Sequence, residues 1–191
     1  MAWLQRFGLL DSKTSDLAEI FSPFMQLMFK HHLDFTRTFR LLSQFRSTSS
    51  EHADRFLDHI CPKASVPHHL RDGCHNEWRT WLDTWQERLE ASEKAAGSSA
   101  EDRQKRLRSA NPRFICRQWV LEEVIKRLEQ KNDKGFLQRV LDMATRPFEA
   151  YGEDDVYTEA CANLTREEAD QKRLCGLGDQ SMLGFQCSCS S

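Results

Sequence analysis

Two cysteines at the C-terminal end of the sequence have a type and spacing that could support redox chemistry. Cys187 and Cys189 are separated by one serine and lie in the polar sequence Cys-Ser-Cys-Ser-Ser. Chain ends are normally accessible, whereas structural cysteines are usually buried. An accessible thiolate can exchange with a disulfide elsewhere, while a bond between two such close neighbours would be strained. The pair is therefore a candidate redox site, and the alternative is two incidental surface thiols.

A second group of possible ligands lies in the middle of the chain. Zinc takes four nitrogen or sulfur ligands, and this stretch offers five candidates: Cys61, His68, His69, Cys74 and His75. Their spacing fits no standard zinc motif, so we predict no metal site and keep a zinc-stabilised helical domain as a weaker alternative. The seven cysteines are scattered without a CxxC pair. This pattern suggests no disulfide framework, and reduced thiols are expected.

Other catalytic patterns are not visible in the sequence. Gly176-Leu-Gly178 has no strand before it and no Lys-Ser/Thr after it, so a phosphate loop is not indicated. No paired carboxylates and no nucleophile–base arrangement stand out from the general charge. The basic run from Arg103 to Arg117 is accompanied by acidic residues, which favours a solvated face. We therefore predict no catalytic, cofactor-binding or metal-binding residue in this chain.

Composition excludes several classes of partner. The 191 residues carry a net charge of −2, which does not indicate a nucleic-acid binder. No run approaches the ~18 apolar residues of a membrane span. The first residues also lack the basic and apolar regions of a secretory signal. Neither nucleic acid nor a membrane is expected as a partner.

Helical periodicity organises the first half of the chain. Apolar residues recur at helical spacing from Leu17 to Met28, and Pro23 is expected to kink or split that helix. Asp34 is expected to cap a second helix. A loop is predicted over Cys61–Cys74. It is followed by a helix over Trp78–Leu89 with three tryptophans on one face, which requires a large partner surface.

The stretch Asn111–Tyr151 predicts a helical hairpin. Pro112 suits the first helical position, and the polar residues Asn132–Gly135 form the turn. Two apolar stripes at helical spacing follow from the sequence: Leu121, Val124, Ile125 and Leu128, then Leu137, Val140, Leu141 and Ala144. Two such helices should pack antiparallel and bury both stripes against each other and against something larger.

The predicted fold class is all-α, because no alternating runs indicate strands. Residues 1–94 form a helical segment with the Trp-rich helix, and residues 95–110 a linker and a charged helix. Residues 111–151 form the hairpin. Residues 152–191 form a polar, irregular tail, in which Thr165–Glu168 fits a capping box.

Several stretches together resemble the C-terminal part of the selenoprotein O family. The Asn-Pro-Arg-Phe helix entry and the Cys-Ser-Ser end are the most specific. The matching stretches occur in the family's order: Arg6–Leu10, Asp34–Leu42, Trp78–Leu89, Asn111–Arg127, Arg146–Phe148 and Cys189–Ser191. The resemblance spans most of the chain, more loosely over residues 47–72 and 153–179.

The resemblance implies a kinase-like (pseudokinase) fold that binds ATP with magnesium and transfers AMP to hydroxyl side chains of proteins. It also implies a mitochondrial location and a redox role. Some members carry selenocysteine at the position of Cys189, and a thiol is less readily oxidised than a selenol. The family's glycine-rich loop, ATP-contacting lysine and metal-binding acids lie upstream of the matched region.

Because those nucleotide-binding parts are not matched in this sequence, two functions are proposed for it. The first is a fragment, short isoform or truncated gene model of a protein adenylyltransferase, inactive alone, which supports a missing N-terminal kinase-like lobe and carries the tail cysteines. ATP and magnesium then belong to the full-length protein. The second is a free-standing helical interaction module without catalysis.

Overall fold

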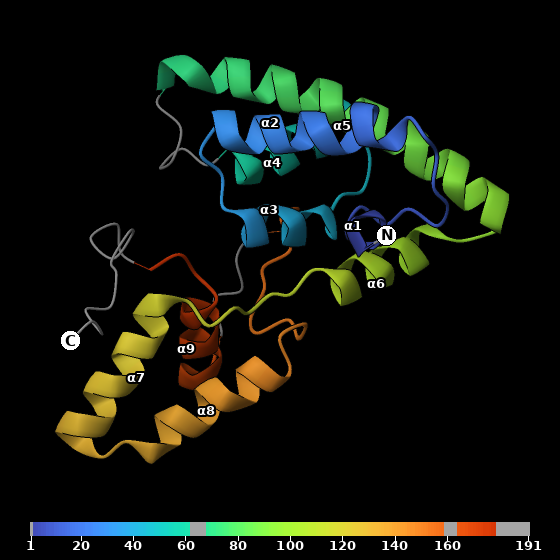
Figure 1. Ribbon diagram of the computed structural model, residues 1–191. Helices are drawn as coiled ribbons and strands as arrows, with labels where there is room; N and C mark the ends of the chain where they lie inside the picture. The colour runs from blue at the N-terminus through green and yellow to red at the C-terminus, as the bar shows by residue number, and fades with distance from the viewer. Residues whose placement is uncertain (1, 62–67, 159–163, 179–191) are drawn as a thin grey trace. The chain divides into compact units, whose positions relative to one another are not determined.

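The computed structural model describes residues 2–61, 68–158 and 164–178, without the side chains of residues 2, 50 and 68–72. These residues form helices and connections with no strand, which confirms the all-α class (Figure 1). The chain divides into two compact units. Unit 1 comprises Met1–Asn111 with Asp155–Glu159, and unit 2 comprises Pro112–Asp154 with Ala160–Ser191.

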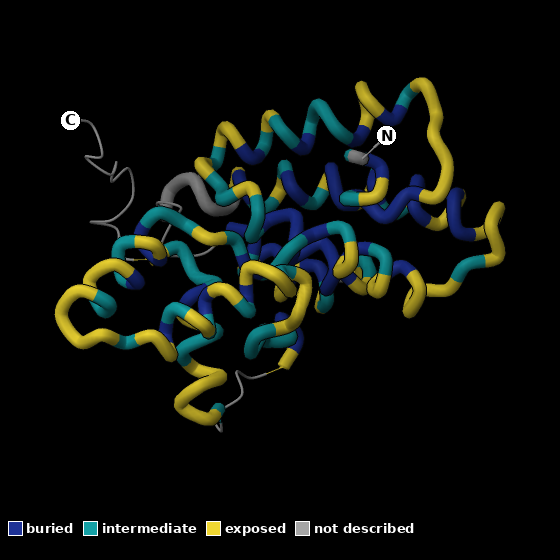
Figure 2. Tube along the Cα trace, turned by 60° about the horizontal axis from the view of Figure 1, so that its bottom comes forward, coloured by how far each residue is buried: buried dark blue, intermediate teal, exposed yellow. Residues whose placement is uncertain are grey.

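Unit 1 is assembled along one long helix, α5. Its elements are α1 (Ala2–Arg6), the π-helix η1 (Leu17–Phe21), α2 (Ser22–Lys30), α3 (Phe35–Leu42), α4 (Ser50–Ile60), α5 (His68–Ala96) and α6 (Ala100–Ala110). Trp78 and Trp85 of α5 are fully buried, and the indole N–H of Trp85 donates to the Phe7 carbonyl at 3.0 Å. Buried residues line the inner sides of these helices (Figure 2). The Trp-rich face therefore lies in the core, as the sequence predicts.

Two predicted helix boundaries in unit 1 are confirmed. The π-helix η1 ends directly before α2, in whose first turn Pro23 lies. Proline is tolerated there because its missing N–H would have no partner inside the helix. Asp34 caps α3, since its side chain accepts a hydrogen bond from the Arg37 N–H at 2.8 Å.

The predicted loop over Cys61–Cys74 is partly wrong. Helix α5 already begins at His68, and Cys61 and Cys74 form a disulfide in place of the expected free thiols. Both cysteines are fully buried. Gly73 misled the prediction, because one glycine costs a helix only about 1 kcal/mol and does not end a helix stabilised by tertiary packing. The disulfide joins the end of α4 to the first turns of α5.

The solvated face predicted for the basic run after residue 103 is wrong at its start. Arg103 is buried, and its guanidinium donates to the Glu93 carboxylate through Nε at 2.7 Å. Arg106 reaches the same carboxylate at 3.1 Å. The linker predicted over residues 95–100 is shorter in the structure, because α5 continues to Ala96 and α6 begins at Ala100. The tight turn between them ends at Ser99, which makes a capping box with Asp102 in the first turn of α6. This turn brings α6 back so that its arginines meet Glu93 of α5.

Unit 2 contains the hairpin α7 (Gln118–Lys131) and α8 (Lys134–Thr145), together with α9 (Arg166–Leu174). Asn132 ends α7 in a left-handed conformation at φ 50°, and Asp133 caps α8 by accepting from the Phe136 N–H. These positions confirm the predicted turn. The capping box of Thr165 and Glu168 at the start of α9 is also confirmed.

The predicted start of the hairpin at Pro112 is wrong. The N–H groups of Arg113 and Phe114 both donate to the Pro147 carbonyl, at 2.7 and 3.0 Å. These bonds hold the chain before α7 against the residues that follow α8, and the helix begins only at Gln118. Phe114 is thereby buried in the core of unit 2.

The predicted apolar stripes are buried only in part. The core of unit 2 takes Trp119, Val120 and Val124 from α7, and Phe136, Val140 and Met143 from α8. Leu121, Ile125 and Leu141 of the stripes are exposed instead. Each helix therefore has an apolar arc that is wider than the face it buries within unit 2.

Candidate functional site

The residues singled out in the sequence do not assemble into one site. Cys187 and Cys189 lie outside the described residues. Cys61 and Cys74 are joined to each other, so their thiols are not available as zinc ligands. His75 Nε2 lies 3.6 Å from an Asp58 carboxylate oxygen. In the part of the chain that the structure describes, no group of three or more His, Cys, Asp or Glu could hold a metal ion.

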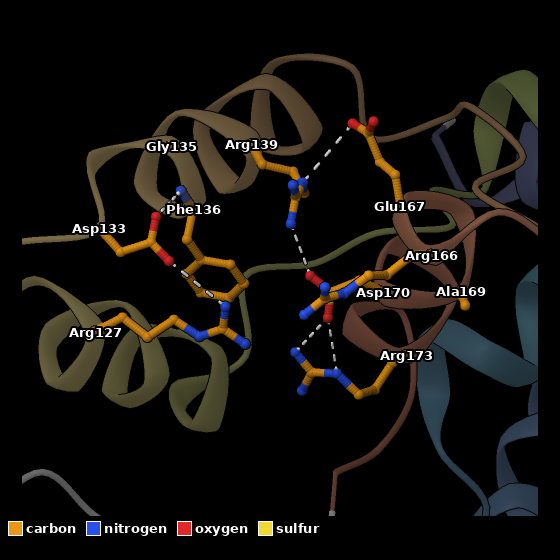
Figure 3. Close-up of a pocket in the computed structure, with 10 residues that line it drawn as sticks. All are labelled: Arg127, Asp133, Gly135, Phe136, Arg139, Arg166, Glu167, Ala169, Asp170 and Arg173. Carbon is orange, nitrogen blue, oxygen red and sulfur yellow. Dashed lines mark hydrogen bonds and ion pairs between the residues drawn. The ribbon is translucent and has the colours of Figure 1, made fainter. Parts of the chain in front are cut away.

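A charged pocket of about 690 Å³ lies within unit 2, among α7, α8 and α9 (Figure 3). This volume falls in the range of small-molecule sites. The pocket is lined by Arg127, Asp133, Gly135, Phe136, Arg139, Arg166, Glu167, Ala169, Asp170 and Arg173. Four guanidinium groups therefore face three carboxylates in one cavity.

Asp170 is the central carboxylate of the pocket. One of its oxygens accepts from Arg139 Nη1 at 2.8 Å, and the other accepts from Arg173 Nε and Nη2 at 3.0 and 2.7 Å. Arg139 belongs to α8, while Asp170 and Arg173 belong to α9. The bond from Arg139 therefore joins α9 to the hairpin, while the bonds from Arg173 lie within α9.

Glu123 of α7 provides a second link to α9. Its two oxygens accept from Arg173 Nη1 and Nη2 at 2.8 and 2.9 Å. Arg127, one turn further along α7, donates to the same carboxylate at 2.5 Å. Burial alone would lower the pKa of Arg173, but its hydrogen bonds to Glu123 and Asp170 outweigh that effect and raise the pKa. The guanidinium of Arg173 therefore stays charged at neutral pH.

Two arginines of the network also lie over aromatic rings. The Arg127 guanidinium carbon is 3.9 Å from the centroid of Phe136, and that of Arg173 is 5.6 Å from Trp119. A cation over an aromatic face is attracted by the ring quadrupole. Both rings belong to the core of unit 2. The charged network is thus attached to the apolar core beneath it.

Most of the charges that line the pocket are paired with one another. Beside its carboxylates and guanidinium groups, the described lining holds no Ser, Thr, Cys, Tyr, Lys or His side chain. Arg127, Arg139 and Arg173 are each paired with carboxylates, whereas Arg166 is exposed at the first position of α9. A network in which nearly every positive charge already has a carboxylate is better suited to fastening a helix than to binding a ligand.

This network was missed by sequence reasoning, although parts of its signal were present. Glu123 with Arg127, and Asp170 with Arg173, are opposite charges at helical spacings of four and three residues. Such pairs are common on solvated helices, so they did not reveal which helices would meet. Only the packing of α9 on the hairpin joins the two pairs into one network.

No helix among the described residues is long and apolar enough to cross a membrane.

The chain is similar to known proteins over most of its length. The sequence model of the family described as protein adenylyltransferase SelO matches residues 1–145. A protein nucleotidyltransferase YdiU from Vibrio vulnificus is 28% identical over 156 residues, which are 80% of this chain and 28% of that protein. Its namesake from Xanthomonas euvesicatoria is 28% identical over 169 residues, 86% of this chain and 29% of the relative. The protein nucleotidyltransferase YdiU from Erwinia tasmaniensis is 31% identical over 146 residues, which are 75% of this chain and 26% of that protein.

The matched region contains all of unit 1 up to Asn111 and the whole hairpin of unit 2. The chain spans less than a third of the length of these curated relatives. The family match covers well over half of the chain, and the relatives carry the corresponding activity in their names. This chain therefore belongs to the protein adenylyltransferase SelO family.

Proposed function

We propose that this chain is the helical C-terminal part of a longer SelO-type protein adenylyltransferase. The longer protein transfers AMP from ATP, with magnesium, to hydroxyl side chains of other proteins. It carries the nucleotide site on a kinase-like lobe that this chain does not contain, and it acts in the mitochondrion. The observation that carries the proposal is a family match over residues 1–145 in a chain that spans only 28% of a relative's length.

The arrangement of the described residues supports a scaffold role for this part. The charges of the pocket in unit 2 are largely paired with one another, as are those around Arg88 and Glu93 in unit 1. Phosphoryl and nucleotidyl transfer depend on positioned cations and metal ions that neutralise the phosphates. Paired arginines of this kind stabilise helices and leave that chemistry to another part of the protein.

The test compares the chain with a longer polypeptide. The reading frame upstream of Met1 should encode a glycine-rich loop and metal-binding acids. The longer product should transfer labelled AMP from ATP to protein, whereas the 191-residue chain should neither bind ATP nor transfer AMP. An upstream sequence without such a frame would contradict the proposal, as would AMP transfer by the 191-residue chain alone.

A redox role for the tail is a further part of the proposal. It rests on Cys187 and Cys189, which lie one residue apart at the end of the sequence. Mild oxidation should protect these thiols from alkylation, and reductant should restore them. Intact mass would show the protection in the wild type and its loss in Cys189→Ser. Complete alkylation of the oxidised wild-type tail would contradict this role.

A second candidate is a non-catalytic helical interaction module. It is favoured by the two hydrophobic cores of the described residues, which give each unit an interior of its own. A monomeric, cooperatively folding chain that binds no ATP and has no upstream coding frame would select this candidate over the first.

A further inference from the structure

The hairpin of unit 2 carries an exposed apolar face. On α7, Leu121 and Ile125 are 46% and 45% exposed, and on α8, Leu141 is 49% exposed. Leu128 and Leu137 are partly buried and pack against the core of unit 2. Isolated exposed leucines are common on proteins, but a contiguous group indicates an interaction surface. Whether these residues form one surface depends on the side of each helix from which their side chains project.

Helical geometry places the two rows on the same side of the hairpin. Leu121 follows the buried Val120, and Ile125 follows the buried Val124, so each is rotated about 100° from the core. Leu141 follows the buried Val140 in the same way. Figure 1 shows that α7 runs to the turn and α8 runs back from it, so the two helices have opposite directions. A rotation in the same sense along each therefore carries both rows to one side. We call this surface, made of Leu121, Ile125, Leu128, Leu137 and Leu141, the outer face.

The opposite side of the hairpin is already covered. There α9 packs on the core through Leu174, and its ion pairs join Asp170 to Arg139 and Arg173 to Glu123. Within the described residues of unit 2, the hairpin therefore has one side with a partner and one apolar side without. The outer face contains none of the charges that hold α9.

The extent of the family match bears on what covers the outer face. The match includes α7 and all of α8, whereas α9 lies beyond residue 145. The hairpin is thus a family element, and most of each relative's length lies outside the region that this chain spans. We infer that the outer face docks onto an apolar surface of that remaining part of the longer SelO polypeptide. The inference rests on the proposed function and adds the surface by which the two parts are joined.

The experiment places a charge on the outer face in two proteins. The double variant Ile125→Glu/Leu141→Glu is made in the 191-residue chain and in the longer polypeptide, with Gln130→Glu, an exposed position of α7, as the matched control. In the short chain the double variant should lower Tm by no more than about 4 °C, because water already reaches about half of each side chain, and it should reduce the fluorescence of an apolar dye. In the longer polypeptide it should lower Tm by more than about 8 °C, because it buries carboxylates.

Three results would overturn the inference. The first is a large fall in Tm of the short chain, since the face would then be buried within it. The second is a dimer of the short chain that the double variant converts to monomer, since a second copy would then be the occupant. The third is an unchanged Tm in the longer polypeptide. If the double variant prevents the longer polypeptide from folding, Ile125→Ala gives the same comparison through a cavity.

AMP transfer is measured on the same proteins and separates the two claims. If the longer polypeptide transfers AMP but the double variant leaves its Tm unchanged, the docking surface is contradicted and the proposed function stands. If the longer polypeptide transfers no AMP but the double variant lowers its Tm, the activity is contradicted and the docking surface stands.

Discussion

At the scale of single residues, unit 1 depends on a buried ion pair. Arg88 of α5 and Asp16, just before η1, are 7% and 1% exposed, and Arg88 Nε donates to Asp16 Oδ1 at 2.6 Å. Arg88 also bonds to the carboxylate and the carbonyl of Asp11, at 3.0 and 2.9 Å. Removing one partner of a buried pair leaves the other charge without compensation in a medium of low dielectric constant.

Arg88→Met should therefore destabilise the chain by about 3–5 kcal/mol, measured by urea unfolding. The matched control is Arg79→Met, which breaks the pair of Arg79 with Asp54 on the exposed side of the same helix. That change should cost less than about 1 kcal/mol, because exposed pairs contribute little. Similar losses in both variants would contradict the importance of burial at Arg88.

The same pair predicts how stability depends on pH. Burial by itself raises the pKa of Asp16, but the hydrogen bonds from Arg88 and from the Lys13 N–H outweigh it, so the pKa is lowered. In the unfolded chain the pKa of an aspartate side chain is about 3.9. A folded pKa below that value means that the contribution of Asp16 is complete above about pH 5, where the unfolded carboxyl is also ionised, and is lost as pH falls through the folded pKa. Between pH 5 and 2, Asp16→Asn should lose less stability than the wild type. Parallel curves would refute this.

At the scale of elements, two glycines have opposite roles. Gly73 lies inside α5, and a Cβ there would meet nothing within 4 Å. Gly178, at φ +79°, lies against Trp119, and a Cβ there would approach the indole Cδ1 to 2.8 Å. The first position only weakens its helix, whereas the second allows the chain after α9 to pack against the core of unit 2.

The same substitution at these positions should change stability in opposite directions. Gly73→Ala should stabilise unit 1 by about 0.5–1 kcal/mol, because alanine restricts the unfolded chain and favours the helix. Gly178→Ala should destabilise unit 2 by more than about 1 kcal/mol, through backbone strain and the clash with Trp119. Chemical denaturation of both variants tests the pair. A loss of stability in Gly73→Ala would show that its position has neighbours other than solvent.

At the scale of the whole molecule, the described residues form two separate hydrophobic cores. The larger contains the α5 tryptophans, and the smaller contains Trp119 with the inner face of the hairpin. The disulfide Cys61–Cys74 belongs to the first alone. A change at the disulfide should therefore be detected in one unit and not in the other.

Reduction of the disulfide should lower the stability of unit 1 by about 3 kcal/mol, because a cross-link closing a loop of this size restricts the unfolded chain. Hydrogen exchange should then accelerate in α4 and α5 but not in α7 or α8. The variant Cys61→Ala/Cys74→Ala, treated with the same reductant, shows any effect of the reductant that does not involve this disulfide. Equal acceleration in both units would contradict the separation of the cores.

Much of this fold could be predicted from local signals, and the rest depended on contacts that local signals do not encode. Capping by Asp34, the break before Pro23 and the turn at Asn132 depend on neighbouring residues, and all three predictions are confirmed. The start of α7 was missed because Pro147, which holds residues 113 and 114, lies over thirty residues away. The pocket was missed because its arginines and carboxylates come from three helices.

The disulfide has one more consequence, for the continuity of the backbone. Cys61 and Cys74 bracket the only peptide connection between α4 and α5. A protease cut or an engineered split between them would yield two polypeptides that stay covalently joined and migrate as one species until a reductant is added. The thiol–disulfide state of this pair, rather than the intact main chain, would then decide whether the helices before the cut, α1 to α4 with η1, remain covalently joined to the rest of the protein.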